Sequence, residues 1–375
     1  MITCWYKDIS MANYSSNLQN ASDKVVDWQV VSSHCGCWKR YSGRKHFLQG
    51  NCKFVSFPPY VPALEGTSGP RALHLLLSAS TLFLQSLRGI AYLAKCKDSD
   101  IIHYQQSTSP SFGISALYGL LSIPVQKKRI VTVHSIDPLS RFRVFSRSYK
   151  NADRILVHSN EMKEKMLSLD VPESRIRLVP HGTMPPPLLK TPRKEITFFG
   201  SPNKGKGFWT ILSALKILKE QDRDVHVNIY GIYNDTEKNE AINEATHIGV
   251  ADLLVWGDRL SEEKFNQKMQ ESVFTLAVYS LTVSGSSVVT RAMGNATPII
   301  ASNIGGIPEY LGDGGLLVPP DDPKALASAM AKLLDDPSLR ERFSTMARRR
   351  AENFSWDRVA EMTAGIYYEC LRENP

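Results

Sequence analysis

Residues 291–302 read RAMGNATPIIAS, and this stretch decides the fold. It predicts a helix that ends at Gly294, a turn through Thr297-Pro298 and then a short β-rich run. The run leads to a Gly305-Gly306 turn. A helix start that faces such a turn, at the carboxyl end of a strand, is where an open parallel sheet binds phosphate. We therefore expect a phosphate-binding α/β sheet in this part of the chain.

Strands and helices alternate in both halves of the chain, as is typical of parallel α/β sheets. The elements expected in the first half are strands at Ile2–Tyr6, Trp28–Ser32, Phe54–Phe57, Asp100–Tyr104, Arg129–His134 and Arg154–His158, with helices at Met11–Ala21 and Arg71–Lys95. Those expected in the second half are strands at Glu195–Phe199, Val225–Tyr230, Leu253–Val255 and Phe274–Val278, with helices at Gly207–Glu220, Ser261–Ser272, Asp322–Asp335, Pro337–Glu352 and Trp356–Leu371.

A proline-rich segment separates the two halves. The chain has 375 residues, more than one ordinary core, so two domains are expected. Thr183–Lys194 contains Pro185-Pro186-Pro187 and Pro192, which interrupt helices and inner strands. We therefore expect an α/β protein with two doubly wound, Rossmann-like domains, the first over residues 1–187 and the second over residues 188–355, and a final helix over residues 356–375.

The composition is that of a soluble globular protein, with 42% hydrophobic and 22% charged residues. Cys35-Gly36-Cys37 lacks the CxxC spacing of a zinc site, so we expect free buried thiols in a reducing cytosol, the alternative being a metal site. No basic stretch precedes Cys4, and no secretory signal is expected. These features favour a cytoplasmic protein.

The most apolar stretch is Arg71–Lys95. Arg88, Gln85 and several serines interrupt it, so its uninterrupted apolar part is too short to span a membrane. We expect a core helix here. The alternative is an amphipathic helix that lies on a membrane surface.

Positive charge is concentrated in the first half of the chain. The formal net charge is +8, and residues 1–187 hold 23 Lys and Arg against 12 Asp and Glu, whereas the rest hold 22 against 25. This asymmetry indicates an anionic partner for the first half, the alternative being a solvated basic surface. No helix-turn-helix, zinc finger or RNP-like run is present, so nucleic acid is not expected and an anionic membrane surface or lipid-phosphate acceptor fits better. The basic groups are Lys39, Arg40, Arg44 and Lys45; Lys127, Lys128 and Arg129; and Arg141, Arg143, Arg147 and Lys150.

Five motifs in combination resemble a known family. They are FFGSPNKGKG at residues 198–207, RAMGNATPIIAS at 291–302, GGIPEYL at 305–311, GGLLVPPDD at 314–322 and FSW at 354–356. The chain resembles GT-B glycosyltransferases of the large group 1 (GT4-type) family, with a strong match from residue 151 to residue 371. The resemblance implies two domains that face each other across a cleft and a C-terminal helix that crosses back to the first domain. It also implies a nucleotide-sugar donor on the second domain and a carbohydrate or lipid-linked acceptor on the first.

The resemblance implies a retaining, metal-independent hexosyltransferase that builds a surface polysaccharide or glycolipid, with no cofactor beyond the donor. Similar enzymes dock on the inner face of the membrane, and each basic residue near such a leaflet contributes on the order of 1 kcal/mol. Peripheral membrane association is therefore expected. No Asp-x-Asp dyad is placed to hold a metal.

The leaving nucleoside diphosphate needs cations and N–H groups aimed at it. Lys206 starts a helix just after the glycine-ended strand at Gly200, and it matches the lysine of the family's Arg-x4-Lys pair. Ser201 stands at the position of that arginine, and Lys204 is the candidate substitute. The alternative for Lys206 is a solvent-facing loop lysine.

The family's two loop glutamates, eight positions apart, are replaced here by Val283 and Arg291. Arginine cannot accept hydrogen bonds from ribose hydroxyls, but Arg291 can pair with a phosphate or a nearby carboxylate. The loop keeps small residues whose N–H and hydroxyl groups can reach the donor. The candidates there are Ser284, Gly285, Ser286 and Ser287.

The remaining candidates lie at the ends of other strands. Gly257 and Asp258 occupy the place where the family reads the base, and Glu309 belongs to the motif after the Gly-Gly turn. His134 ends a strand and matches the family's first-domain histidine, so we expect it at the acceptor, with a structural histidine as the alternative. Ser10, in the first loop, is a further acceptor-side candidate, and Asp137 either orients His134 or caps the next helix.

Two rival functions remain open. A degenerate GT-B protein would serve as a partner subunit without transferring sugar. A sugar-nucleotide epimerase is disfavoured because the paired carboxylates and histidines of that chemistry are absent near the expected cleft.

Overall fold

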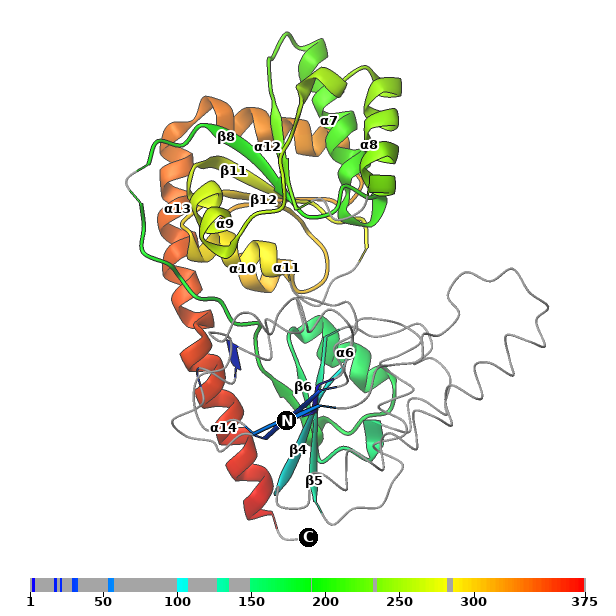
Figure 1. Cartoon of the computed structure of the whole chain (residues 1–375), viewed down its shortest axis with the longest axis vertical. Coiled ribbons are helices and arrows are strands. Elements are labelled where there is room, and N and C mark those ends of the chain that lie inside the picture. The colour runs from blue at the N-terminus through cyan, green and yellow to red at the C-terminus, as the bar shows by residue number, and fades with distance from the viewer. Residues whose placement is uncertain are drawn as a thin grey trace, which may run out of the picture. The chain divides into compact units, whose positions relative to one another are not determined.

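The computed structural model describes residues 2–3, 17–18, 21, 29–32, 53–56, 100–106, 127–134, 149–189, 191–231, 235–281 and 286–373. The chain divides into two compact units (Figure 1). Residues 1–180 and 356–375 form the first unit, and residues 181–355 form the second. The proline-rich segment Thr183–Lys194 thus lies at the start of the second unit, and the final helix belongs to the first.

The first unit contains a parallel sheet of seven strands in the order β3-β2-β1-β4-β5-β6-β7. The strand order reverses between β1 and β4, as in a doubly wound fold. The strands are β1 Ile2–Thr3, β2 Gln29–Ser32, β3 Lys53–Ser56, β4 Ile101–Gln106, β5 Lys128–Val133, β6 Arg154–Val157 and β7 Ile176–Leu178.

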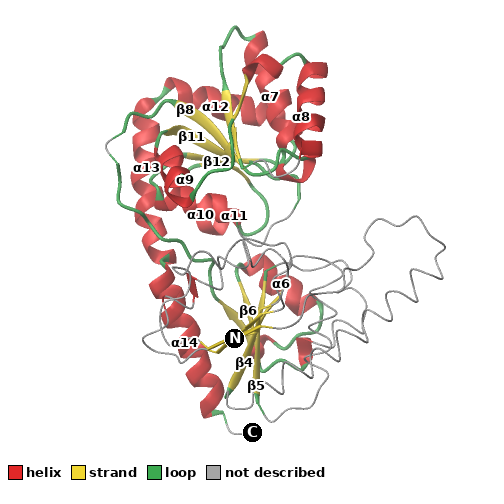
Figure 2. Ribbon diagram, viewed as in Figure 1, coloured by secondary structure: helices red, strands yellow, loops and turns green. Residues whose placement is uncertain are grey.

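Helices cover both faces of the described part of this sheet (Figure 2). On one face α6 (Asn160–Ser168) buries Met162 and Met166 against β4–β6, and it begins where the Ser159 hydroxyl accepts from the Met162 N–H. A short 3₁₀ turn, η2 (Glu173–Arg175), leads into β7. On the other face lies the last helix, α14 (Trp356–Arg372).

The last helix is amphipathic, and its apolar stripe packs on β5 and β6 of the first unit. Val359 and Ile366 contact the cluster that includes Ile130 and Leu156. A fully buried aliphatic side chain contributes about 1.5–3 kcal/mol, so the stripe is enough to hold the helix in place. The expected return of the C-terminal helix to the first domain is confirmed.

The second unit contains a parallel sheet of six strands in the order β10-β9-β8-β11-β12-β13. Its strands are β8 Glu195–Phe199, β9 Val227–Tyr230, β10 Leu254–Trp256, β11 Ser272–Ala277, β12 Ile299–Ser302 and β13 Leu316–Val318. Its helices are η3 Lys204–Lys206, α7 Phe208–Glu220, α8 Asp235–Ile248, η4 Ala251–Leu253, α9 Glu262–Gln270, α10 Ser287–Gly294, α11 Ile307–Leu311, α12 Pro323–Asp335, α13 Pro337–Ala351 and η5 Glu352–Phe354.

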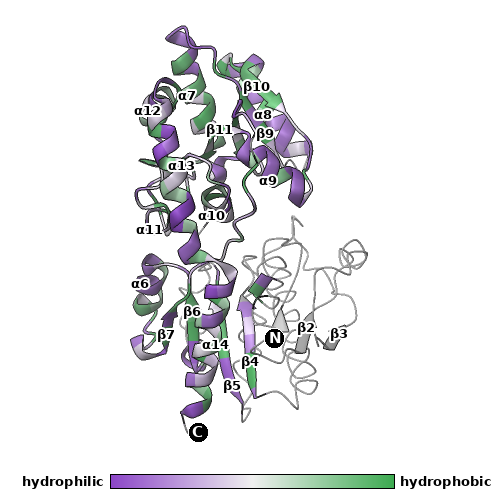
Figure 3. Cartoon of the chain, turned by 90° about the vertical axis from the view of Figure 1, so that its left-hand side faces the viewer, coloured by the Kyte–Doolittle hydropathy of each residue, from purple (hydrophilic) through white to green (hydrophobic). Residues whose placement is uncertain are grey.

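Two clusters of buried side chains lie on the two faces of this second sheet. One joins α7, α8 and α12 to the sheet, and the other joins α9, α10, α11 and α13 to its opposite face (Figure 2). Helix α7 is largely apolar, whereas α13 is largely polar along its length (Figure 3). Both sheets are therefore covered by helices, and the predicted GT-B architecture of two α/β units with parallel sheets is confirmed.

In the second unit, the expected end of a helix at Gly294, the turn after it and the strand that follows are confirmed. Helix α10 ends at Gly294, and the turn that follows places Ala296 at φ +54° before β12 begins. Helix α8 was not expected, because it buries only Ala241 and Ala245 and shows no strong apolar period. The expected helices Met11–Ala21 and Arg71–Lys95 lie largely or wholly outside the described residues.

Candidate functional site

The candidate donor site lies where the strand order of the second sheet reverses. From β8 the chain proceeds to β9 and β10 on one side, and from β11 to β12 and β13 on the other. In open α/β sheets, ligands bind at the carboxyl ends of the strands beside such a point. Two loops leave the sheet there, residues 200–207 after β8 and residues 278–281 after β11, and α10 begins at Ser287.

The two loops are in direct contact, and glycine makes the close approach possible. The Ser280 N–H donates to the Gly205 carbonyl at 3.3 Å. Gly207 has φ +63°, and a Cβ there would lie 2.5 Å from the Val278 carbonyl oxygen. No side chain fits in that space, so a glycine is required at residue 207. The Asn203 side chain accepts from the Lys206 N–H at 3.1 Å and fixes the turn that presents Lys206.

Lys206 lies over an aromatic ring supplied by the second loop. Its ammonium nitrogen is 4.8 Å from the centre of the Tyr279 ring, within the range of a cation–π interaction. The Tyr279 hydroxyl is 2.6 Å from the Ser286 hydroxyl, which in turn accepts from the Val289 N–H and caps α10. A cation, a phenol and a helix N-terminus therefore meet at the carboxyl edge of β8 and β11.

The backbone of Tyr279 is held by a buried serine of the neighbouring strand. The Tyr279 N–H donates to the Ser302 hydroxyl oxygen at 2.7 Å, and the Ser302 hydroxyl donates to the Tyr279 carbonyl at 3.0 Å. The sequence alone indicated neither Tyr279 nor Ser302 as part of the site. The available signal was a tyrosine immediately after a buried strand, at the edge where polar groups of parallel strands collect.

The structure places most of the donor-loop candidates at this edge. Gly200 has φ +137° at the end of β8, and the half-buried Ser201 follows it. Lys204 is exposed, whereas Lys206 is half-buried. At the start of α10, Ser286 is buried and Ser287 is exposed. The candidates Ser284 and Gly285 lie outside the described residues, as does Val283.

Arg291 contacts a carboxylate. Its guanidinium carbon is 3.5 Å from the centre of the Phe265 ring, and its Nη2 donates to Glu262 Oε1 at 2.6 Å. Both partners belong to α9. Of the two partners suggested by the sequence, phosphate or a nearby carboxylate, the structure thus supplies the carboxylate.

The candidates Gly257, Asp258 and Glu309 belong to segments that follow other strands of the same sheet. Gly257 follows β10, and a Cβ there would lie 2.5 Å from the Tyr230 ring, while Asp258 is exposed. Glu309 is half-buried on α11, and its carbonyl accepts from the Arg350 guanidinium. Within the described ranges, no direct hydrogen bond joins these three residues to Lys206.

In the first unit, three histidines of adjacent strands lie in one hydrogen-bonded chain. His158 Nδ1 is 2.8 Å from the Val179 carbonyl oxygen, and its Nε2 is 3.0 Å from His134 Nδ1. His134 Nε2 is 2.8 Å from Gln105 Oε1, and Gln105 Nε2 is 3.2 Å from His103 Nε2. His134 therefore has a protein partner at each ring nitrogen.

The far end of this chain reaches the last helix. His103 Nδ1 is 2.5 Å from the Tyr367 hydroxyl of α14, and His103 Nε2 is 2.7 Å from the Thr132 hydroxyl. Burial lowers the pKa of His103 to about 3, so this ring is neutral at physiological pH. The acceptor-side candidates Ser10 and Asp137 lie outside the described residues.

His181, at the start of the second unit, is a structural residue in this arrangement. Its backbone N–H donates to the Tyr310 hydroxyl at 2.7 Å, and its Nδ1 is 3.0 Å from the Gly182 carbonyl oxygen. Burial lowers the pKa of His181 to about 4. The ring of His181 is therefore neutral, and its backbone N–H links the start of the second unit to α11.

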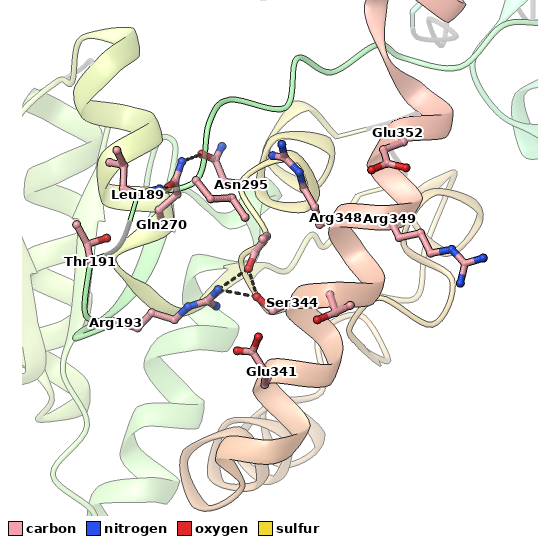
Figure 4. Close-up of a pocket in the computed structure, with 13 residues that line it drawn as sticks. Leu189, Thr191, Arg193, Gln270, Asn295, Glu341, Ser344, Arg348, Arg349 and Glu352 are labelled. Atoms are coloured by element: carbon pink, nitrogen blue, oxygen red, sulfur yellow. Dashed lines mark hydrogen bonds between the residues drawn. The ribbon is translucent and has the colours of Figure 1, made fainter.

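A separate cavity of about 430 Å³ lies along the proline-rich segment, between it and α13 (Figure 4). Arg193 reaches across it and donates to the Ala296 carbonyl at 2.6 Å and to the Ser344 hydroxyl at 2.5 Å. Arg348 donates to the carbonyls of Pro186 and Gly294. These arginines hold the proline-rich segment against the rest of the second unit and are not part of the candidate donor site.

Neither a metal site nor a membrane-spanning helix is found in the part of the chain that the structure describes. It holds no group of three His, Cys, Asp or Glu side chains placed to bind a metal ion. None of its helices has both the length and the apolar character needed to cross a membrane.

Two family models match consecutive parts of the chain. The model for glycosyl transferases group 1 matches residues 183–350, and the model for glycosyltransferase family 4 matches residues 52–185. The chain belongs to the group 1 glycosyltransferases. The first match covers the candidate donor site of this group 1 member, with Lys206, Tyr279 and Ser286, and the second covers its histidine chain from His103 to His158.

Curated relatives of this group 1 member match part of it. A D-inositol 3-phosphate glycosyltransferase of Streptomyces avermitilis is 33% identical over 130 residues, which are 34% of this chain and 28% of the relative. An MMP alpha-(1->4)-mannosyltransferase of Mycolicibacterium hassiacum is 31% identical over 170 residues, 44% of this chain and 40% of the relative. The matched stretch thus spans less than half the length of either relative.

Solved structures match the whole chain in fold. HepE of Anabaena in complex with UDP has a TM-score of 0.72 at 13% identity, covering 98% of this chain and 99% of that one. A glycosyltransferase of Rickettsia africae has a TM-score of 0.72 at 15% identity, covering 100% and 98%. At these identities the likeness establishes the fold, in agreement with the predicted GT-B class.

Proposed function

We propose that this group 1 family member is a glycosyltransferase that moves a sugar from a nucleotide-sugar donor to a glycolipid, lipid-linked or polysaccharide acceptor. The donor diphosphate binds at the carboxyl edge of β8 and β11, and the acceptor binds on the first unit. Transfer proceeds with retention and without a metal ion or other cofactor. The observation that carries the proposal is the position of Lys206 over Tyr279 beside the start of α10.

The chemistry of the donor edge supports this role. Cleavage of a nucleotide sugar leaves negative charge on the diphosphate, and a fixed ammonium aimed at that charge lowers the barrier. Helix α10 begins at the same place, and the positive end of its dipole favours an anion. Lys206 and α10 together offer the charge neutralisation that other enzymes obtain from a bound cation. The structure of HepE with UDP, a protein of the same fold, is consistent with a nucleotide donor.

Positive charge in the first half supports an anionic acceptor or surface. The names of two relatives indicate that one of them acts on D-inositol 3-phosphate and that the other is a mannosyltransferase. We propose peripheral association with the inner face of the membrane through the basic groups of residues 1–187, of which Lys127, Lys128 and Arg129 lie in the described region at the start of β5. Salt-sensitive co-sedimentation with anionic vesicles tests this, and no binding at low salt would contradict it.

The experiment that tests transfer measures release of nucleoside diphosphate. The full chain is incubated with UDP-, GDP-, ADP- and dTDP-sugars and with extracts of lipid-linked and polysaccharide acceptors. Acceptor-dependent release with one donor, lost in Lys206→Ala, supports the enzyme, and the anomeric configuration of the product reports retention or inversion. Tight binding of a nucleoside diphosphate without release would favour the degenerate partner subunit.

A further inference from the structure

Four non-glycine residues have a positive φ in the described ranges, and three of them end helices. Asp170 follows α6, Asp222 follows α7 and Ala296 follows α10, with φ of +58°, +55° and +54°. In each case the N–H of the next residue donates to the carbonyl five positions before it, which is the pattern of a left-handed helix cap. The end of a helix therefore explains the backbone of these three residues.

Asp321 is the fourth, and no helix ends there. Its φ is +54°, in the turn between β13 and the start of α12. Glycine takes this conformation at no steric cost, whereas a residue with a Cβ is strained in it. The neighbouring Asp322 has an evident role, because its carboxylate accepts from the Ala325 N–H at 2.9 Å and caps α12. The backbone of Asp321 needs a different explanation, which its side chain supplies.

The Asp321 carboxylate connects two segments on either side of the reversal point of the second sheet. Its Oδ1 accepts from the Ser280 hydroxyl at 2.5 Å and from the Thr210 hydroxyl at 3.3 Å. Ser280 belongs to the loop after β11, and Thr210 lies in the first turn of α7, the helix that begins two residues after Lys206. One carboxylate oxygen therefore joins three segments that are distant in the sequence.

Ser280 is the residue through which the loops after β8 and β11 meet. Its N–H donates to the Gly205 carbonyl at 3.3 Å, and it directly follows Tyr279, whose ring lies against the Lys206 ammonium. We propose that Asp321 is a positioning residue of the candidate donor site, which holds Ser280 so that the two loops keep Lys206 directed at the donor diphosphate. Strained backbone is commonly kept where it serves a site. The role rests on the proposed function, since it concerns binding of that diphosphate.

The side chain and the backbone of Asp321 act on different quantities. Asp321 is exposed, and water replaces a lost hydrogen bond at the surface with little change in the free energy of unfolding. A loop that is already held in one conformation, however, binds its ligand more tightly than a loop that must be ordered on binding. Loss of the carboxylate should therefore weaken donor binding, whereas relief of the backbone strain should raise stability.

Three substitutions separate these effects. Asp321→Ala removes the carboxylate and keeps the strain, Asp321→Gly removes both, and Asp321→Asn keeps an oxygen that can accept from Ser280. Each full chain is titrated calorimetrically with UDP, GDP, ADP and dTDP, and the nucleotide that binds the wild type is the probe. We expect the alanine and glycine variants to bind it equally weakly, by about three- to tenfold, and the asparagine variant to bind within about twofold of the wild type. The second unit of the glycine variant should nonetheless melt about 2–4 °C above that of the alanine variant.

Asp222 is the matched control, because it is exposed and has nearly the same φ, +55°, at the end of α7. Asp222→Ala and Asp222→Gly should differ in melting temperature in the same direction, but both should bind the probe as the wild type does. Wild-type affinity in Asp321→Ala or Asp321→Gly, or no rescue by Asp321→Asn, would overturn the proposal. A wild type that binds none of the four nucleotides would instead refute the proposed function itself, so the two failures are distinguishable.

Discussion

The ammonium of Lys206 lies 4.8 Å from the centre of the Tyr279 ring, although the two residues belong to loops that follow different strands. The ring shields one side of the ammonium and leaves its remaining N–H groups to point away from the ring. Tyr279 is itself fixed by Ser286 through its hydroxyl and by Ser302 through its backbone. A lysine held in this way loses less side-chain entropy on binding a phosphate than a freely mobile one.

Tyr279→Phe should weaken donor binding while keeping the ring beneath Lys206. The substitution removes the 2.6 Å hydrogen bond to Ser286, the residue that caps α10. We expect a loss of about 1 kcal/mol in the free energy of unfolding and a few-fold weaker affinity for the nucleoside diphosphate. Tyr230→Phe is the matched control, since it removes a 2.7 Å hydrogen bond to Glu195. Equal losses of affinity in the two variants would show that the Tyr279 hydroxyl has no specific role in donor binding.

Gly207→Ala should destabilise the second unit more than Gly249→Ala does. Both glycines have positive φ, +63° and +84°, so either alanine is strained by about 1 kcal/mol. A Cβ at residue 207 would also lie 2.5 Å from the Val278 carbonyl, whereas nothing lies within 4 Å of one at residue 249. Urea unfolding of the two variants isolates the steric contribution. Equal stabilities of the two variants would show that the loops after β8 and β11 are not in close contact.

Gly365→Ala should stabilise the first unit. Gly365 is exposed in α14, and a Cβ there would meet no atom within 4 Å. Alanine in a helix interior is favoured over glycine by roughly 0.5–1 kcal/mol. The melting temperature of the variant should rise accordingly. A fall would mean that residue 365 is covered by something in solution, such as a second copy of the chain.

Glu369→Gln should weaken the attachment of α14 in a pH-dependent way. Glu369 accepts from both Arg154 and Arg177, and Arg154 is only 5% exposed. These partners, Arg177 first, lower the pKa of Glu369 below its usual value of 4.5. A carboxyl with a lowered pKa stabilises the fold above the unfolded-state pKa, and this stabilisation is lost as the pH falls through the folded-state pKa.

The variant should therefore be less stable than the wild type near neutral pH, by on the order of 1 kcal/mol because Glu369 is partly exposed and solvent screens the pair. The difference should shrink once the pH falls below 4.5, the usual pKa of a glutamate carboxyl. Thermal unfolding at several pH values measures it. Glu173→Gln, which breaks an exposed pair with Lys163, is the control and should change stability less. A difference that does not depend on pH would exclude the ion pairs as its cause.

Local signals in the sequence were sufficient for most elements of the second unit, with helix α8 as the exception. Gly294 and Thr297-Pro298 are residues of the kinds that commonly end a helix, and the glycines at residues 200 and 207 mark a strand end and a tight turn. The site itself depends on partners that are distant in sequence. Arg291 meets Glu262 across two helices, and nothing local to residue 291 predicts which carboxylate it finds.

The histidine chain shows the same limit. His134 and His158 end predicted strands and His103 lies within one, so their presence in one sheet was foreseeable. Which ring nitrogen meets which partner depends on strand register, and register is set by the packing of the whole sheet. The role of Tyr367 depended on the return of α14, which only the family resemblance suggested.

Calorimetric titration of the full chain with UDP, GDP, ADP and dTDP tests the donor site most directly. The comparison is with Lys206→Ala and with Lys216→Ala, an exposed lysine of α7 that serves as the matched control. We predict that one nucleotide binds and that Lys206→Ala weakens it about tenfold or more, since a hydrogen bond to a charged group contributes about 1.5–3 kcal/mol. The Lys216 variant should bind as the wild type does. Unchanged affinity in Lys206→Ala, or no binding of any of the four, would contradict a donor site at this edge.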